Sequence, residues 1–532
     1  MSTLTGTGTL VRLVLRRDRL RLPIWIVVIP GLVTATAAAI IELYPNKGER
    51  LALGLTIGAN PALRALTGPI FDPSSAGGLT AWRVTGIAAV LAGLMSVLFV
   101  TRHTRAEEET GRAELIGAGA VGRHALLAAA VLVAGGANLA VALLGALGLA
   151  GQGLPVPGAL AFGLSVAGAG WVFTGVAALV AQLTETARAA NAVALAALGL
   201  AFLLRAAGDA AGGDTLSWLS PLGWAQQVRA FAGERWGVLT LFVVVGMALL
   251  AVADLLTGRR DVGAGMLPSR RGPATATPRL SGPTALAWRL HRGVLLGWVI
   301  AFAVVGTVFG ALALSVGDLV DDSPQLAGLM TRLGGAGAIV DAFLATEMSL
   351  LGMVAAGYAV QAALRPRAEE AAGRAEPVLA AAVPRWRWLA GHLVWTLGGA
   401  ALLLAVAGLA AGLAHGIRVG DPVGQALRIA GAAMVQVPAV WVPAGIAVLL
   451  FGIAPRLTTL VWMVLVAFVL LGQLGRLLGI DERIQDLSPF AHLPRVPGDE
   501  VTFGPLAWLL VVTAALVLAG VAGFRRRDLT GG

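Results

Sequence analysis

Long apolar runs without charged residues alternate with short polar segments along the whole chain. An α-helix needs about 20 mostly apolar residues to cross a bilayer, whereas a barrel strand needs only about ten. The pattern therefore predicts twelve membrane-spanning helices, and the shortest runs, the fifth and the eighth, are expected to be tilted or broken. The runs cover residues 22–41, 84–100, 125–150, 159–183, 189–204, 237–253, 293–316, 349–364, 389–413, 429–453, 458–474 and 506–524.

The composition agrees with this pattern. Of the 532 residues, 57% are hydrophobic and 13% are charged, whereas soluble domains carry roughly 25% charged residues. A string of water-exposed domains is therefore excluded, and an integral membrane protein is expected. The chain contains no cysteine, which excludes disulfides, thiolate metal sites and thiol nucleophiles.

The distribution of charge predicts the orientation in the membrane. With the N-terminus in the cytoplasm, the inner segments hold 26 Arg and 12 acidic residues, and the outer segments hold 12 Arg, Lys47 and 17 acidic residues. The inner side is then about +14 and the outer side about −4, as the positive-inside rule requires. Both termini are expected in the cytoplasm, and residues 1–21, rich in Arg, are expected to form a basic interfacial helix.

Two parts of the chain carry the same motifs. Residues 105–114 read Arg-Ala-Glu-Glu-Glu-Thr-Gly-Arg-Ala-Glu, and residues 367–376 read Arg-Ala-Glu-Glu-Ala-Ala-Gly-Arg-Ala-Glu, so eight of ten positions are identical. Shorter matches follow in the same order: Val121 and Arg123 recur as Val383 and Arg385, Leu-Ser-Pro at 219–221 recurs at 487–489, and Arg-Arg-Asp at 259–261 recurs at 526–528.

These matches predict two tandem six-helix units, residues 22–262 and 284–532, joined by a cytoplasmic linker at 263–283. Because each unit has an even number of spans, both units have the same topology. They are expected to be related by a pseudo-two-fold axis along the membrane normal, with a transport pathway near it.

No arrangement of residues predicts catalysis or a metal site. The six His are scattered, and no zinc-binding, nucleophile-elbow or phosphate-loop motif is present. The predicted spans hold almost no ionisable residue, which disfavours coupling to protons or sodium ions. If nucleotide drives this protein, we expect ATP and Mg²⁺ to be bound by a second polypeptide, with no cofactor on this chain.

The repeated acidic and basic segments are the strongest functional signal. Each lies on the cytoplasmic side between the second and third spans of its half. On a helix, Glu108 and Arg112, and likewise Glu370 and Arg374, are four residues apart in the favourable order for an ion pair. One such segment is usually a solvated charged turn, but two in equivalent positions favour docking onto a symmetric partner.

This acidic stretch, followed by a basic residue and the third span, resembles the coupling helix of ABC-2-type exporter permeases. Together with Leu-Ser-Pro-Leu-Gly-Trp at 219–224 and the Arg-Arg-Asp endings, it makes the chain similar to actinobacterial multidrug and polyketide-antibiotic exporter permeases of the tetronasin type. The resemblance covers nearly the whole chain. It implies an all-α, type V ABC exporter-like fold of two six-helix units, each with a re-entrant hairpin between its last two spans, driven by a separate ATP-binding cassette dimer.

The resemblance also assigns residues to two contacts with the ATPase. The first coupling helix would contain Glu107, Glu108, Gly111, Arg112 and Glu114, and the second Glu369, Glu370, Gly373, Arg374 and Glu376. The second copy departs from the first at Pro377, where the helix is expected to start late or kink.

The external re-entrant hairpins would lie at 218–236 and 486–503. Each contains a Ser-Pro pair, which can end one helix and cap the next. The residues assigned to the hairpins are Ser220, Pro221, Trp224, Ser488, Pro489 and His492.

The sequence thus predicts the plasma-membrane permease subunit of an ATP-driven exporter of lipophilic or amphiphilic compounds. The expected partners are a homodimeric ATPase, the lipid bilayer and a hydrophobic substrate, and no nucleic acid. A twelve-span secondary carrier of the major facilitator type is the alternative. Its usual basic turn after the second span is acidic here. An ABC importer permease and a membrane-embedded lipid-modifying enzyme fit the motifs less well.

Overall fold

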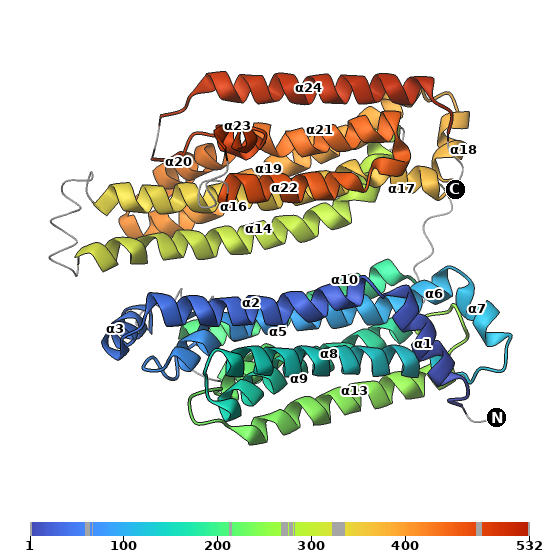
Figure 1. Ribbon diagram of the computed structural model, residues 1–532. Helices are drawn as coiled ribbons and strands as arrows, with labels where there is room; N and C mark the ends of the chain where they lie inside the picture. Colours follow the sequence, from blue (N-terminus) through green and yellow to red (C-terminus); the bar gives the residue numbers. More distant parts are fainter. Residues whose placement is uncertain are drawn as a thin grey trace. The chain divides into compact units, whose positions relative to one another are not determined.

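The computed structural model describes residues 3–58, 64–65, 67–211, 215–267, 275, 280, 282–321, 336–474, 481–498 and 500–529. Across these ranges every regular element is a helix, and eleven helices are long and apolar enough to cross a bilayer (Figure 1). The chain forms two compact units, residues 1–272 and 273–532. The boundary between them falls within the expected linker at 263–283.

The first unit is built around one central helix. This helix, α9 (Val156–Leu183), packs against α5, α8 and α13, and it buries Phe162 and Phe173 completely. The other long helices of the unit are α2 (Arg21–Leu43), α5 (Ala76–His103), α8 (Ala125–Gly151), α10 (Ala187–Ala211) and α13 (Leu239–Arg259). The shorter elements are α1 (Thr7–Arg17), α3 (Lys47–Gly58), α6 (Arg105–Glu109), α7 (Arg112–Gly117), α11 (Thr215–Trp218), α12 (Pro221–Gln227) and η1 (Trp236–Val238).

The second unit has its core between α14, α16, α19 and α21, where Phe451 and Tyr358 are buried. Its long helices are α14 (Pro283–Asp321), α16 (Ala336–Ala363), α19 (Arg385–Val419), α20 (Pro422–Met434), α21 (Val437–Ile453), α22 (Leu460–Leu474) and α24 (Phe503–Arg526). The shorter elements are α17 (Arg365–Ala371), α18 (Ala375–Ala380), η3 (Pro455–Leu457), α23 (Glu482–Gln485) and η4 (Pro489–His492).

Glycines allow several of these helices to touch backbone to backbone. A Cβ atom added to Gly310 of α14 would lie 2.0 Å from the carbonyl oxygen of Ala411 in α19, and one added to Gly306 would lie 2.4 Å from that of Ala407. Small residues spaced four apart are a common way for membrane helices to approach closely, because apolar burial gives little net attraction between helices in lipid.

Of the two short spans expected to be tilted or broken, neither is broken. Both α10 and α16 are continuous, with 25 and 28 residues. The apolar runs looked short because Arg205 interrupts the first and Glu347 the second, whereas the helices continue through both charges. A break occurs instead in the expected tenth span, where α20 ends at Met434 and α21 begins at Val437. The expected span 458–474 contains α22, which is shorter than the eleven helices that are long enough to cross a bilayer.

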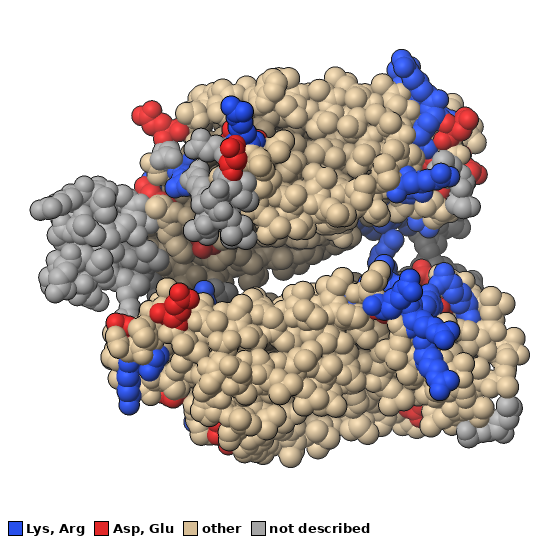
Figure 2. All heavy atoms as spheres, in the orientation of Figure 1, with Lys and Arg blue, Asp and Glu red and all other residues tan. Residues whose placement is uncertain are grey.

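Charged side chains gather at the two ends of the long helices in each unit, and the surface between these ends is free of blue and red in Figure 2. Large apolar side chains are exposed in this belt, for example Ile24 and Val27 of α2, at 60% and 64%. An apolar surface of this kind is suited to contact with lipid rather than water.

Candidate functional site

Each unit carries two short helices directly after one of its long helices. In the first unit, α5 leads into α6, and Gly111 then joins α6 to α7; in the second unit, α16 leads into α17, which Gly373 separates from α18. Both glycines adopt the left-handed conformation, with φ of 72° and 68°, which residues with a side chain rarely adopt. We call α6 with α7 the first helix pair, and α17 with α18 the second helix pair.

Four of the six glutamates predicted to contact a partner, Glu107, Glu108, Glu369 and Glu370, are largely buried inside their own unit. In the first helix pair, the Glu108 carboxylate accepts hydrogen bonds from Nη1 and Nη2 of Arg260 at 2.8 and 2.5 Å and from Arg105 at 2.5 Å. Arg260 lies directly after the end of α13. The neighbouring Glu107 is 4% exposed and pairs with Arg17 at 2.7 Å.

The second helix pair has a matching arrangement. The Glu370 carboxylate accepts hydrogen bonds from Nη1 and Nη2 of Arg527 at 2.6 and 2.7 Å, and Arg527 lies directly after the end of α24. Glu369 is 5% exposed and pairs with Arg365 and Arg374, each at 2.8 Å.

One more arginine completes the arrangement in each unit. Arg123 donates a hydrogen bond to the main-chain carbonyl of Arg260, and Arg385 donates one to that of Arg527. We call Glu108, Arg260 and Arg123 the first clasp, and Glu370, Arg527 and Arg385 the second clasp. The clasps were not predicted from the sequence. The signal that points to them is the recurrence of Arg-Arg-Asp at 259–261 and 526–528.

The ion pairs expected from helical spacing are shifted by one residue. Arg112 lies 3.7 Å from Glu107, and Arg374 lies 2.8 Å from Glu369. The expected partners were Glu108 and Glu370, four residues before each arginine. The shift has a physical cause, since the left-handed glycine ends the helix before each arginine and the four-residue spacing no longer applies.

The residues exposed on the two helix pairs differ in character. The first presents Arg112, Glu114 and Leu115, of which Leu115 is 78% exposed. The second presents Arg374, Glu376 and Pro377. Helix α18 begins at Ala375, one residue later than the position equivalent to the start of α7, and it continues through Pro377. A proline is tolerated in the first turn because the amide hydrogen there needs no helical partner.

The N-terminal helix α1 packs against the start of α8 and forms an ion pair with the first helix pair. Leu10 and Val14 of α1 are buried, and Leu10 packs with Ala125 and Ala129 at the start of α8. The hydrogen bond with Glu107 raises the pKa of the Arg17 guanidinium. Within the interfacial helix expected at 1–21, the structure has α1, which buries Leu10 and Val14 against protein and leaves Leu13 and Leu15 exposed, at 41% and 46%.

The first expected hairpin is built on a buried serine. The Ser220 side chain caps α12 by accepting hydrogen bonds from the amides of Leu222 and Gly223, and it donates one to the carbonyl of Ala201 in α10 at 2.7 Å. Trp224 is 9% exposed and stacks edge-on against Phe242. Pro221 occupies the first position of α12, as the Ser-Pro signal predicts.

The second hairpin repeats this contact. Ser488 is fully buried and donates a hydrogen bond to the carbonyl of Phe468 in α22 at 2.8 Å. Pro489 is buried at the start of η4, and Nδ1 of His492 lies 3.2 Å from the carbonyl oxygen of Ser488. The segments assigned to the hairpins thus fold back onto long helices of their own unit.

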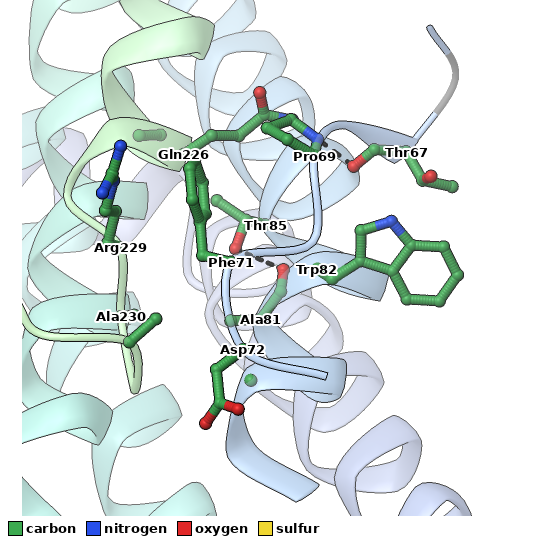
Figure 3. A pocket seen from close by; sticks show the side chains of 13 residues that line it. Thr67, Pro69, Phe71, Asp72, Ala81, Trp82, Thr85, Gln226, Arg229 and Ala230 are labelled. Carbon is green, nitrogen blue, oxygen red and sulfur yellow. Dashed lines mark hydrogen bonds between the residues drawn. The ribbon is translucent and has the colours of Figure 1, made fainter. Parts of the chain in front are cut away.

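A small pocket lies beside the first hairpin (Figure 3). Gln226 and Arg229 line it, facing Phe71 and Asp72 from the preceding loop. Its volume is about 20 Å³, enough for about one water molecule. Phe231, in the turn that follows, packs against Gly77 and Gly158, where a Cβ would lie 2.6 and 2.2 Å from its ring.

A much larger cavity of about 750 Å³ opens between α2, α5 and α10 of the first unit. Its lining is mostly apolar, including Val84, Ile87 and Phe202, and Arg83 is the charged residue in it. Drug-sized ligands bind in pockets of about 300–1,000 Å³ with few polar groups. The cavity therefore has the size and chemistry for a lipophilic molecule.

The expectation that the spans hold almost no ionisable residue is wrong for α10. Arg205 and Asp209 lie within this candidate span, are 0% and 5% exposed, and approach to 3.3 Å. Asp209 also accepts a hydrogen bond from Ser217 at 2.8 Å. The sequence pattern missed them because the expected fifth span ended at residue 204. Among the described residues, no group of three His, Cys, Asp or Glu is placed to hold a metal ion.

These features define a multi-pass integral membrane protein that carries two helix pairs, one in each unit. Residues 11–256, and again 280–525, match the family model of the multidrug efflux system permease Rv1217c, C-terminal domain. The chain is 47% identical over 529 residues to the multidrug efflux system permease protein Rv1217c of Mycobacterium tuberculosis (strain ATCC 25618 / H37Rv), covering 99% of this chain and 96% of that protein. The chain belongs to the family of Rv1217c-type multidrug efflux permeases and is a plasma-membrane protein.

Proposed function

We propose that this permease is the membrane subunit of an ATP-driven exporter of the ABC-2 type, and that it consists of two tandem six-helix halves. A separate ATP-binding cassette dimer would bind ATP and Mg²⁺ and dock on the two helix pairs. Closure of that dimer would move the helix pairs and open the transport pathway to the outside by alternating access.

The observation that carries this proposal is the occurrence of the same paired short helices twice. Each follows a long helix, bends at a left-handed glycine and exposes charged side chains near its tip. A symmetric ATPase dimer needs two such surfaces on its membrane partner. The chain itself carries no phosphate-binding loop, so the nucleotide site belongs to another protein.

The substrate is proposed to be a lipophilic or amphiphilic, drug-like compound. The cavity between α2, α5 and α10 has an apolar lining with a single charged residue, Arg83. Such a lining excludes sugars and inorganic ions, because these would lose their hydration shells without gaining polar partners. The name of the Mycobacterium tuberculosis relative, a multidrug efflux system permease, agrees with this substrate class.

The proposal is tested by purifying the chain together with an ATP-binding cassette protein from its native host. We expect Leu115→Arg combined with Glu376→Arg to abolish co-purification and ethidium export, because both side chains are exposed on the helix pairs. Arg418→Glu is the matched control. Arg418 is exposed near the far end of α19 from Arg385, and its reversal should leave co-purification unchanged.

Two results would contradict the proposal. One is unchanged association and export in the double variant. The other is ethidium export by the purified chain alone, driven by a proton gradient, which would instead identify a secondary carrier.

A further inference from the structure

We propose that Arg260 and Arg527 are positioning residues that tie each helix pair to the last long helix of its unit. Through Arg260, a displacement of the first helix pair moves the C-terminal end of α13. Through Arg527, a displacement of the second helix pair moves the C-terminal end of α24. The inference rests on the proposed function, since it assumes that a docked ATPase displaces the helix pairs.

In both units the glutamate–arginine pair is bidentate and largely buried from solvent. The side chains of Glu108 and Arg260 are 9% and 7% exposed, and those of Glu370 and Arg527 are 3% and 14% exposed. Two parallel hydrogen bonds fix the orientation of both groups as well as their distance. Separating such a pair would leave charges buried without a partner, so the two ends move together more easily than they come apart.

The surroundings of the two arginines differ, although the ion pair is the same. Arg260 also donates a hydrogen bond to the side-chain oxygen of Gln182, at 2.6 Å. Arg527 instead lies over the rings of Phe451 and Phe524, at 5.0 and 5.1 Å from their centres. A polar neighbour in one unit and aromatic neighbours in the other differ, whereas the glutamate–arginine pair and the main-chain contact of Arg123 or Arg385 recur in both units. Of these shared contacts, the glutamate–arginine pair is the one that joins the helix pair to the end of the long helix.

The position of each arginine suits the transfer of motion. Helix α13 ends at Arg259 and α24 ends at Arg526, so each tie acts on the residue directly after a helix end. Both helices pack along a central helix of their unit, α9 for α13 and α21 for α24. Because a helix is stiff along its axis, a pull at one end is carried into the membrane part of the unit.

The test uses the full chain reconstituted in liposomes with the ATPase that co-purifies with it. Arg260→Met and Arg527→Met are compared with Arg259→Met and Arg526→Met, which remove the neighbouring, exposed arginines. We expect the clasp variants to keep the ATPase bound but to lose ethidium-stimulated ATP hydrolysis and export by about fivefold or more, the usual range of coupling between two sites. The neighbouring variants should behave like the wild type.

A second variant separates transmission from folding. The chain has no cysteine, so Glu108→Cys with Arg260→Cys places the only two thiols at the first clasp. Before treatment this protein should be uncoupled, and a short bis-maleimide that joins the two thiols should restore stimulated hydrolysis in the same sample. A mono-maleimide should not restore it. Arg260→Lys, which keeps the charge but not the bidentate fork, should give an intermediate loss.

The inference is overturned if the clasp variants bind the ATPase and hydrolyse ATP in response to ethidium as the neighbouring variants do, or if the covalent link restores nothing. Failure of the proposed function gives a different result. In that case no ATPase co-purifies with the wild-type chain. The proposed role of Arg260 and Arg527 in transmitting motion is then rejected together with the proposed function.

Discussion

At the scale of single residues, the glutamates of the helix pairs are held by arginines from distant parts of their own unit. Glu108 and Arg260 are 152 residues apart in sequence, and Glu370 and Arg527 are 157 apart. Substitutions at these glutamates therefore test the stability of the unit as well as any contact with a partner. The two effects are separated by comparing buried with exposed acidic residues of the same segment.

Replacing Glu108 with Ala is expected to destabilise the first unit. The change leaves Arg105 and Arg260 buried without their shared carboxylate, and breaking a buried ion pair costs roughly 3–5 kcal/mol. Glu114→Ala, which removes an exposed carboxylate of the same helix pair, should change stability by less than about 0.5 kcal/mol. Thermal unfolding of the purified variants in detergent measures the difference, and equal melting temperatures would contradict it.

The turn glycine Gly111 should tolerate some side chains and not others. A Cβ added there meets nothing within 4 Å, so the cost of substitution comes from the left-handed backbone alone. Gly111→Val is expected to cost about 1–2 kcal/mol, whereas Gly111→Asn should cost less because Asn adopts this conformation more readily. Co-purification of the ATPase with each variant reports whether α7 keeps its orientation. A Val variant that binds as well as the Asn variant would contradict this account.

At the scale of secondary structure, the apolar pattern predicts where most helices lie but not how they are bounded. Arg205 and Glu347 end an apolar run without ending a helix, because the chain buries or pairs these groups instead of exposing them. The short helix pairs were predicted as charged helical segments, but the bend at Gly111 and Gly373 was not. A glycine in a charged turn does not reveal its backbone angle until the flanking contacts are known.

Because α14 and α19 approach closely at Gly310, a valine there is expected to destabilise the protein more than a valine at Gly297. Gly310→Val should separate the helices, since a Cβ there would lie 2.0 Å from the carbonyl oxygen of Ala411. Overpacking of this kind costs about 1–3 kcal/mol. Gly297→Val in the same helix is the control, because a Cβ there meets nothing within 4 Å. The melting temperatures of the two variants should differ by several degrees, and similar values would argue against the contact.

The two buried serines of the hairpins should contribute independently. Ser220→Ala removes both the cap of α12 and the hydrogen bond to Ala201, and loss of a cap costs about 0.5–2 kcal/mol. Ser488→Ala removes the hydrogen bond to Phe468. Because the serines belong to different compact units, their effects on unfolding in denaturant should add in the double variant. A combined effect far from the sum would mean that the hairpins are coupled.

At the scale of the whole molecule, composition and charge distribution lead directly to a multi-pass membrane protein. The repeated motifs also predict that the chain divides near residues 263–283, where the boundary of the two units falls. The clasps could not be predicted in this way, since their members come from three separate segments of each unit. Sequence likeness shows which motifs recur, whereas only the folded unit shows that Arg123, Arg260 and Glu108 meet.

Orientation is open to a direct test because the chain has no cysteine of its own. Arg112→Cys, on the first helix pair, should be protected from a membrane-impermeant maleimide in spheroplasts and labelled in inverted vesicles. Arg418→Cys should show the reverse. Both arginines are exposed in the structure, so in vesicles from cells that make the chain without the ATPase, access depends only on the side of the membrane. Labelling of Arg112→Cys in spheroplasts would contradict cytoplasmic termini.

The presence of two clasps in one polypeptide has a genetic consequence. In an assembly of two identical subunits, every substitution appears twice, and a change that suits one side is imposed on the other. Here a substitution at Gln182 alters the neighbour of Arg260 and leaves the aromatic neighbours of Arg527 untouched. Each half is therefore free to acquire its own response to a partner, one mutation at a time.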